Sequence, residues 1–220
     1  MDWKSIARLS QEAFREGVNE WIGSARIKGG QINGPSATLT PGSLVSDGNI
    51  ESRILQKLSG SQVPAEIARA LAKELAAAWN DWAKGFQMTI PKAYPSFAAF
   101  PGPVAPPTPA LGAFAVSLGS SVGETSLRAS VLAGKLASAV RVSAGKAGAA
   151  SSDQALKILA DWVESSFNEW KGLVKLVGIV GSGDVPTFAP PYVPVGPVVR
   201  GANLSAGPVF AGPRFGKVTI

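Results

Sequence analysis

The 220-residue sequence predicts a mainly helical protein with extended, proline-rich arms and a few short strands, an α+β arrangement being the alternative. Two observations predict this class. Apolar residues recur at helical spacing in front of three similar Asn-acid-Trp motifs, and 14 of the 17 prolines fall in two segments that are unsuited to helices. The motifs also predict an internal repeat, in which one or two helices and the motif are followed by a strand or arm.

The repeat is defined by a bulky apolar residue, Asn, an acidic residue and Trp, with Gly two or three positions later. Ile6-Ala7-Arg8 and Ile67-Ala68-Arg69 each begin 13 residues before the Asn of the first and second motifs, and this shared offset indicates duplication. The predicted units are residues 1–48, 49–110 and 111–220. We expect the Asn and Trp of each motif to form the core of the repeat: Asn19, Asn80, Asn168, Trp21, Trp82 and Trp170.

A long helix is expected in front of each motif. In the second copy one apolar stripe at helical spacing consists of Ile67, Leu71, Leu75, Ala78 and Trp82. Asp2 is placed to cap the first helix. The Gly residues after the motifs, Gly23, Gly85 and Gly172, are expected to end the helices, with a left-handed conformation at Gly85.

Two further helices precede the second and third copies. A short one begins near Ile50 and is closed by Gly60. An Ala-rich one is predicted from Thr125 to about Ala144, with Ser121 as a cap in front of it. Glu124 and Arg128 are four residues apart and are expected to form an ion pair on this helix.

Extended structure is expected after each motif. Residues 25–31, 86–90 and 173–180 have the composition or alternation of strands. Residues 91–109 and 186–213 then hold seven prolines each, which excludes helices and central strands. We therefore predict two extended or edge-pairing arms in these segments.

The two arms differ from flexible linkers because they carry an aromatic residue or Val every few positions. A plain linker is polar, whereas regularly spaced apolar side chains require a surface on which to be buried. We predict that the arms dock on partner proteins, with these residues as the anchors: Tyr94, Phe97, Phe100, Phe188, Tyr192, Val195, Phe210 and Phe215. If so, deleting residues 186–220 leaves the helical content largely intact.

The composition argues against most site chemistries. The chain has no His and no Cys, so the usual ligands of zinc, haem and iron–sulfur clusters and the usual proton-transfer side chain near neutral pH are missing. The net charge of +6 is spread along the chain rather than gathered into a track for nucleic acid. We therefore predict no catalytic, cofactor-binding or metal-binding residues, no cofactor and no enzymatic activity.

The function favoured by these patterns is structural. Extended arms that run between subunits are typical of virus and phage particles, and the Ala-, Gly- and Pro-rich composition resembles that of particle proteins in general style. We expect a minor, cement or connector protein of a virus or phage virion. Its partners would be capsid, neck or tail proteins, and it would be present in multiple copies.

The alternative is a membrane-peripheral or membrane-active protein that uses the Ala/Gly-rich segment 110–150, with its basic face, at a lipid surface. The sequence has no secretory signal and no apolar run of the ~18 residues that a membrane-spanning helix needs. We accordingly expect a protein that is made in the cytoplasm and becomes associated with a particle. Incorporation into a particle at a fixed ratio, as opposed to binding to anionic liposomes, distinguishes the two hypotheses.

Overall fold

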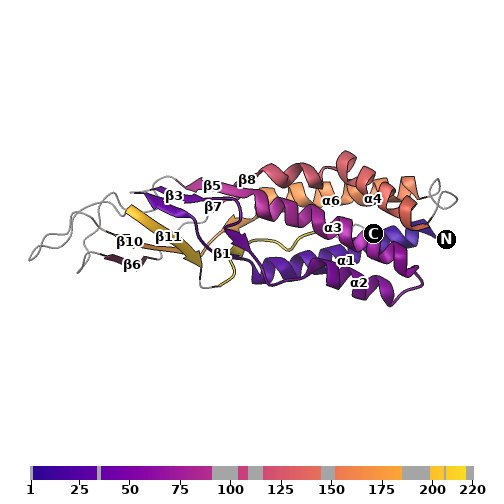
Figure 1. Ribbon diagram of the computed structural model, residues 1–220, viewed down its shortest axis with the longest axis horizontal. Helices are drawn as coiled ribbons and strands as arrows, with labels where there is room; N and C mark the ends of the chain where they lie inside the picture. Colours follow the sequence, from indigo (N-terminus) through magenta and orange to yellow (C-terminus); the bar gives the residue numbers. More distant parts are fainter. Residues whose placement is uncertain are drawn as a thin grey trace, which may run out of the picture.

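The computed structural model describes residues 2–33, 36–90, 104–108, 116–144, 152–184, 199–205 and 207–216. The protein is mainly helical with short antiparallel strands, which confirms the predicted class at this level. The helices pack side by side at one end of an elongated body, and most strands lie at the other end (Figure 1). The described helices are α1 (Trp3–Ser24), α2 (Ile50–Ser59), α3 (Ala65–Gly85), the 3-10 helix η1 (Val122–Leu127), α4 (Ala129–Ala144) and α6 (Asp153–Leu173).

Within the described ranges the strands form three antiparallel sheets. The largest has the order β6-β10-β11-β2-β3-β5-β8, and the smaller two have the orders β1-β4 and β12-β9-β7. Their bounds are β1 (Arg26–Ile27), β2 (Gln31–Asn33), β3 (Ser36–Leu39), β4 (Leu44–Val45), β5 (Phe86–Ile90), β6 (Val104–Thr108), β7 (Val116–Ser117), β8 (Ser120–Ser121), β9 (Lys175–Leu176), β10 (Ile179–Asp184), β11 (Val199–Ser205) and β12 (Phe210–Ala211).

The strand predictions are correct in different degrees. Residues 86–90 form β5 as expected, whereas residues 25–31 are divided between β1 and β2. Residues 173–180 are divided between the end of α6, β9 and the start of β10, and Gly178 lies between the two strands with a φ of 66°. Such a left-handed residue turns the chain and cannot continue a strand.

The proline-rich strand β6 occupies an end of the seven-stranded order. It contains Pro106 and Pro107, which have no amide hydrogen to donate to a ladder. A strand at the edge needs hydrogen bonds on one side only, so this is the position that proline tolerates best.

Helix α1 begins as the sequence predicts. The Asp2 carboxylate accepts hydrogen bonds from the amide groups of Lys4 and Ser5 at 3.1 and 3.2 Å. These bonds satisfy two amide groups that have no partner inside the helix. The Ser5 hydroxyl donates a third bond to the same carboxylate, and these bonds lower the pKa of Asp2.

The three long helices end differently from the prediction. None of the Gly residues after the motifs is left-handed, and α1 and α6 continue past Gly23 and Gly172. Each helix instead gives way at once to an extended residue, namely Ala25, Phe86 or Val174. A left-handed cap turns the chain back, but here the chain leaves each helix directly into a strand, so no such turn is required.

The predicted Ala-rich helix is interrupted. Arg128 is extended, with φ −66° and ψ 134°, and separates η1 from α4. The Glu164 carboxylate of α6 accepts the amide hydrogen of Ala129 at 2.8 Å. This bond satisfies an amide group at the start of α4 that has no partner inside the helix. Glu124 pairs with Lys171 of α6, at 2.5 Å, so the predicted Glu124–Arg128 pair is wrong.

In the part of the chain that the structure describes, five α-helices surround one core in chain order. Helix α1 packs on α2, α2 on α3, α3 on α4, α4 on α6, and α6 returns to α1. Buried apolar residues from all three predicted units belong to this single core cluster, so the units share one interior. In the part of the chain that the structure describes, no helix is both long and apolar enough to cross a membrane.

Candidate functional site

The centre of the core is a cluster of Trp rings that includes the Trp of every motif. Trp21, Trp82 and Trp170 are 4%, 0% and 1% exposed, and Trp79 is fully buried between them. The ring centroids of Trp79 lie 5.6 Å from Trp21, 4.8 Å from Trp82 and 5.6 Å from Trp170. The motifs therefore supply packing, and these buried rings leave no face on which a base or sugar could stack.

Phe215, predicted to anchor an arm on a partner, lies inside this core. Its side chain is fully buried, with the rings of Phe14 at 5.8 Å, Trp79 at 5.4 Å and Trp162 at 6.2 Å. Phe210 is half-buried against Trp170, at 5.3 Å. For Phe215 the docking prediction is therefore wrong, because the spacing of apolar residues shows that they need burial but not where.

Asn19 holds the backbone of Phe215 in place. Its amide nitrogen donates to the Phe215 carbonyl at 3.1 Å, and its side-chain oxygen accepts the Phe215 amide hydrogen at 2.9 Å. The same segment is joined to the body where the Val209 amide donates to the Ala25 carbonyl at 3.0 Å. Deleting residues 186–220 thus removes part of the core, and the expectation that helical content survives this deletion no longer holds.

The other two motif Asn residues have a different environment. Asn80 and Asn168 are exposed, whereas Asn19 is half-buried at its contact with Phe215. Two motif positions are used alike in all three copies: the Trp, and the bulky apolar residue before the Asn (Val18, Trp79 and Phe167), which are buried in the core. The remaining predicted anchors, Tyr94, Phe97, Phe100, Phe188, Tyr192 and Val195, lie outside the described residues.

Two serines each donate a hydrogen bond to a carbonyl near the end of a long helix, and this shared role was not predicted. The Ser46 hydroxyl donates to the Trp21 carbonyl at 2.8 Å, and the Ser121 hydroxyl donates to the Trp82 carbonyl at 2.7 Å. Ser121 also caps η1, as expected. Each of these bonds reaches a carbonyl in the last turn of a helix, where the helix offers no amide four residues further on. The Trp21 carbonyl also accepts from the Ser24 hydroxyl of its own helix at 3.3 Å.

A glycine two residues after each serine lets the chain pass close to the helix. The amides of Gly48 and Gly123 donate to the hydroxyls of Ser46 and Ser121 at 3.1 and 3.0 Å. A Cβ on Gly48 would lie 2.6 Å from the Trp21 Cα, and one on Gly123 would overlap the Asp81 carbonyl. The sequence pattern Ser-x-Gly, at 46–48 and 121–123, could have revealed these two places. We call each place where the returning chain passes over a helix end a Ser-x-Gly crossing.

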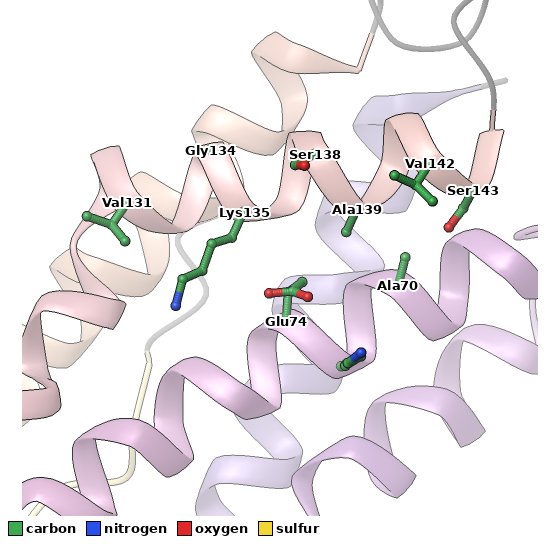
Figure 2. A pocket seen from close by; sticks show the side chains of 10 residues that line it. Ala70, Glu74, Val131, Gly134, Lys135, Ser138, Ala139, Val142 and Ser143 are labelled. Atoms are coloured by element: carbon green, nitrogen blue, oxygen red, sulfur yellow. The ribbon is translucent and has the colours of Figure 1, made fainter.

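A surface groove lies between α3 and α4 (Figure 2). Its volume is about 710 Å³, and it is lined by Ala70, Lys73, Glu74, Val131, Gly134, Lys135, Ser138, Ala139, Val142 and Ser143. Lys135 extends from α4 toward α3, and its ammonium lies 3.8 Å from the Asp81 carboxylate. In the described part of the chain no group of three or more acidic residues is placed to hold a metal ion.

Comparison with known proteins adds no relative. No protein-family model, no curated protein and no solved structure matches the chain.

Proposed function

We propose that the protein is a non-enzymatic structural protein that connects neighbouring subunits of a large assembly. The assembly we favour is a virus or phage virion, in which the chain would serve as a minor, cement or connector protein. The observation that carries this proposal is the seven-stranded sheet at one end of the body, which gathers strands from three distant parts of the chain.

Six of the eight predicted docking residues belong to sequence segments that connect strands of this sheet. Tyr94, Phe97 and Phe100 lie in the sequence between β5 and β6. Phe188, Tyr192 and Val195 likewise lie between β10 and β11. A rigid helical body would thereby present proline-rich, apolar segments from anchored strands, which is a suitable arrangement for holding other proteins together.

The internal repeat belongs to the same proposal, with revised units. We place the units at residues 2–60, 64–144 and 152–216, each consisting of a long helix, an outgoing strand, a returning strand and a return segment. The supporting feature is the Ser-x-Gly crossing, which follows the returning chain of both the first and the second unit. The earlier boundaries at 48 and 110 separate α2 and α4 from the long helices that they follow in this scheme.

The membrane alternative receives less support from the packing of α4. The apolar residues Leu132, Leu136 and Val140 of this helix are fully buried in the bundle. An interfacial helix needs its apolar face free to enter lipid. Since that face is occupied, we favour the assembly hypothesis.

Sedimentation of particles from cells that make the protein tests the proposal. The chain should sediment with a particle at a fixed ratio to its other proteins, and it should not float with anionic liposomes. The triple variant Tyr94→Ala, Phe97→Ala, Phe100→Ala should lose incorporation while its melting temperature is unchanged, whereas the groove variant Lys73→Ala should incorporate normally. Recovery of the wild-type chain only in free form, or salt-sensitive flotation with liposomes, would contradict the proposal.

A further inference from the structure

In each of the three proposed units the chain leaves the long helix in the same way. We call the strand pair that directly follows the long helix the base of the unit. At this position Arg26 pairs with Val45 in the first unit, and Phe86 pairs with Ser121 in the second. In the third unit Lys175 pairs with Ala211. In all three, the strand that follows the Trp helix is thus joined antiparallel to the chain that returns toward it.

The strands beyond these bases are connected in a cycle. The outgoing and returning strands are β2 and β3 in the first unit, β5 and β6 in the second, and β10 and β11 in the third. The returning strand β3 pairs with β5, β6 pairs with β10, and β11 pairs with β2. Each unit therefore gives its returning strand to the outgoing strand of the next unit, and the third gives its strand to the first.

The helical end follows the same cycle. Helix α2 packs between α1 and α3, and α4 packs between α3 and α6. Between α6 and α1 the corresponding place is taken by the extended segment around Phe215, which contacts Trp162 of α6 and Phe14 of α1. Gly212 crosses Val174 at the end of α6, where a Cβ would lie 3.1 Å from the Val174 Cα, as Gly48 and Gly123 cross the ends of α1 and α3.

We propose that the three units are related by an approximate three-fold axis through the Trp cluster, and that the sheet end of this axis docks on a partner with three-fold symmetry. This inference rests on the proposed function and adds the symmetry and copy number of the partner. One chain would bind three identical subunits, each meeting one pair of outgoing and returning strands.

The physical reason is the geometry of repeated contacts. Identical subunits around a three-fold axis present the same surface three times, at intervals of 120° by definition of the symmetry. A chain whose three strand pairs are arranged by the same rotation can engage all three surfaces at once. The three contacts then act together, so that the second and third are effectively intramolecular. The described residues depart from this symmetry in two places. The segment around Phe215 replaces a helix in the third unit. At the sheet end, β5 and β6 of the second unit are not neighbours in the sheet, whereas β2 pairs with β3 and β10 pairs with β11.

Single cysteines test the inference, since the native chain has none. The variants Gln31→Cys, Thr89→Cys and Ser182→Cys place one thiol on each outgoing strand, and Lys73→Cys on α3 is the control. Each variant is labelled with benzophenone maleimide, assembled into the particle in place of the native chain and photocrosslinked. Mass spectrometry then identifies the crosslinked peptides and the ratio of the chain to the crosslinked subunit.

The expected result is that all three strand variants crosslink to the same region of one partner protein, at one chain to three partner subunits, while the Lys73 variant does not. Crosslinks to different proteins from the three strands, crosslinks from one strand alone, or a ratio other than one to three would overturn the three-fold inference and leave the assembly function standing. A chain that enters no particle would refute the proposed function, and the inference with it.

Discussion

The Phe215→Ala variant distinguishes a core segment from a docking arm. The Phe215 ring is fully buried and contacts aromatic rings from α1, α3 and α6. If this contact closes the bundle, removing the ring leaves a cavity between three helices. If residues 213–216 were a free arm, the same substitution would leave the folded body unchanged.

The expected loss is large for a single substitution. Truncating a buried Phe to Ala costs about 3–5 kcal/mol, because apolar burial is lost and a cavity remains. For a protein of this size, about 1 kcal/mol corresponds to roughly 2–4 °C in melting temperature, so a decrease on the order of 10 °C is expected. The total free energy of unfolding of a domain is about 5–15 kcal/mol, so the variant should still fold.

Urea unfolding followed by far-UV circular dichroism and by Trp fluorescence measures the change. The control is Arg214→Ala, which replaces an exposed neighbour in the same segment and should change the free energy of unfolding by less than about 0.5 kcal/mol. Equal unfolding midpoints for the two variants would refute the placement of Phe215 in the core.

Three further variants test particular contacts by the same unfolding measurement. Asn19→Ala should cost about 1–3 kcal/mol because it leaves two backbone groups unpaired, whereas the exposed Asn80→Ala should change stability by less than about 0.5 kcal/mol. Gly123→Ala should cost about 1–3 kcal/mol or more by overlap with a helix carbonyl, whereas Gly134→Ala, with open space in α4, should stabilise by about 0.5–1 kcal/mol. Glu16→Gln should cost about 0.5 kcal/mol at neutral pH, and the cost should disappear in acid.

The pH dependence of the Glu16 variant follows from its partner. A hydrogen bond from Lys57, at 2.9 Å, is the main cause that lowers the pKa of Glu16 from 4.5, and partial burial opposes it. A carboxylate whose pKa is lower in the folded state stabilises the fold above its unfolded pKa and loses this effect as the pH falls through the folded value. The difference in stability between the wild type and the variant should therefore be complete above pH 4.5 and disappear as the pH falls through the lower pKa of the folded state.

For each of these variants a different result would contradict the expected contact. Equal effects of the Asn19 and Asn80 substitutions would mean that the bonds to Phe215 contribute nothing. Equal effects of the two Gly substitutions would mean that the crossing at Gly123 is not close. A stability difference for the Glu16 variant that persists in acid would assign its effect to packing rather than charge.

Local features of the fold could be predicted where the cause was local. The apolar stripe ending at Trp82 predicts α3, and the carboxylate of Asp2 predicts the start of α1, because both depend on residues within one helix. The break at Arg128 could not be predicted in this way. It coincides with the hydrogen bond from Ala129 to Glu164, a residue of another helix.

The position of the candidate docking residues was the least predictable feature. The sequence shows that Phe215 needs burial, but the residue that binds its backbone, Asn19, is 196 positions away. Likewise, the motifs indicate a repeat through Trp, whereas the crossings that support the revised units depend on Ser46 and Ser121. These serines are far in sequence from the Trp carbonyls that they bind, so the motif itself does not contain them.

Hydrogen exchange on the free and the particle-bound chain tests the central claim most directly. We expect binding to protect amides in all three strand regions, residues 31–39, 86–108 and 179–205, and to leave α2 and the outer face of α4 unchanged. Protection confined to one strand region, or located in the groove between α3 and α4, would contradict docking through the sheet end.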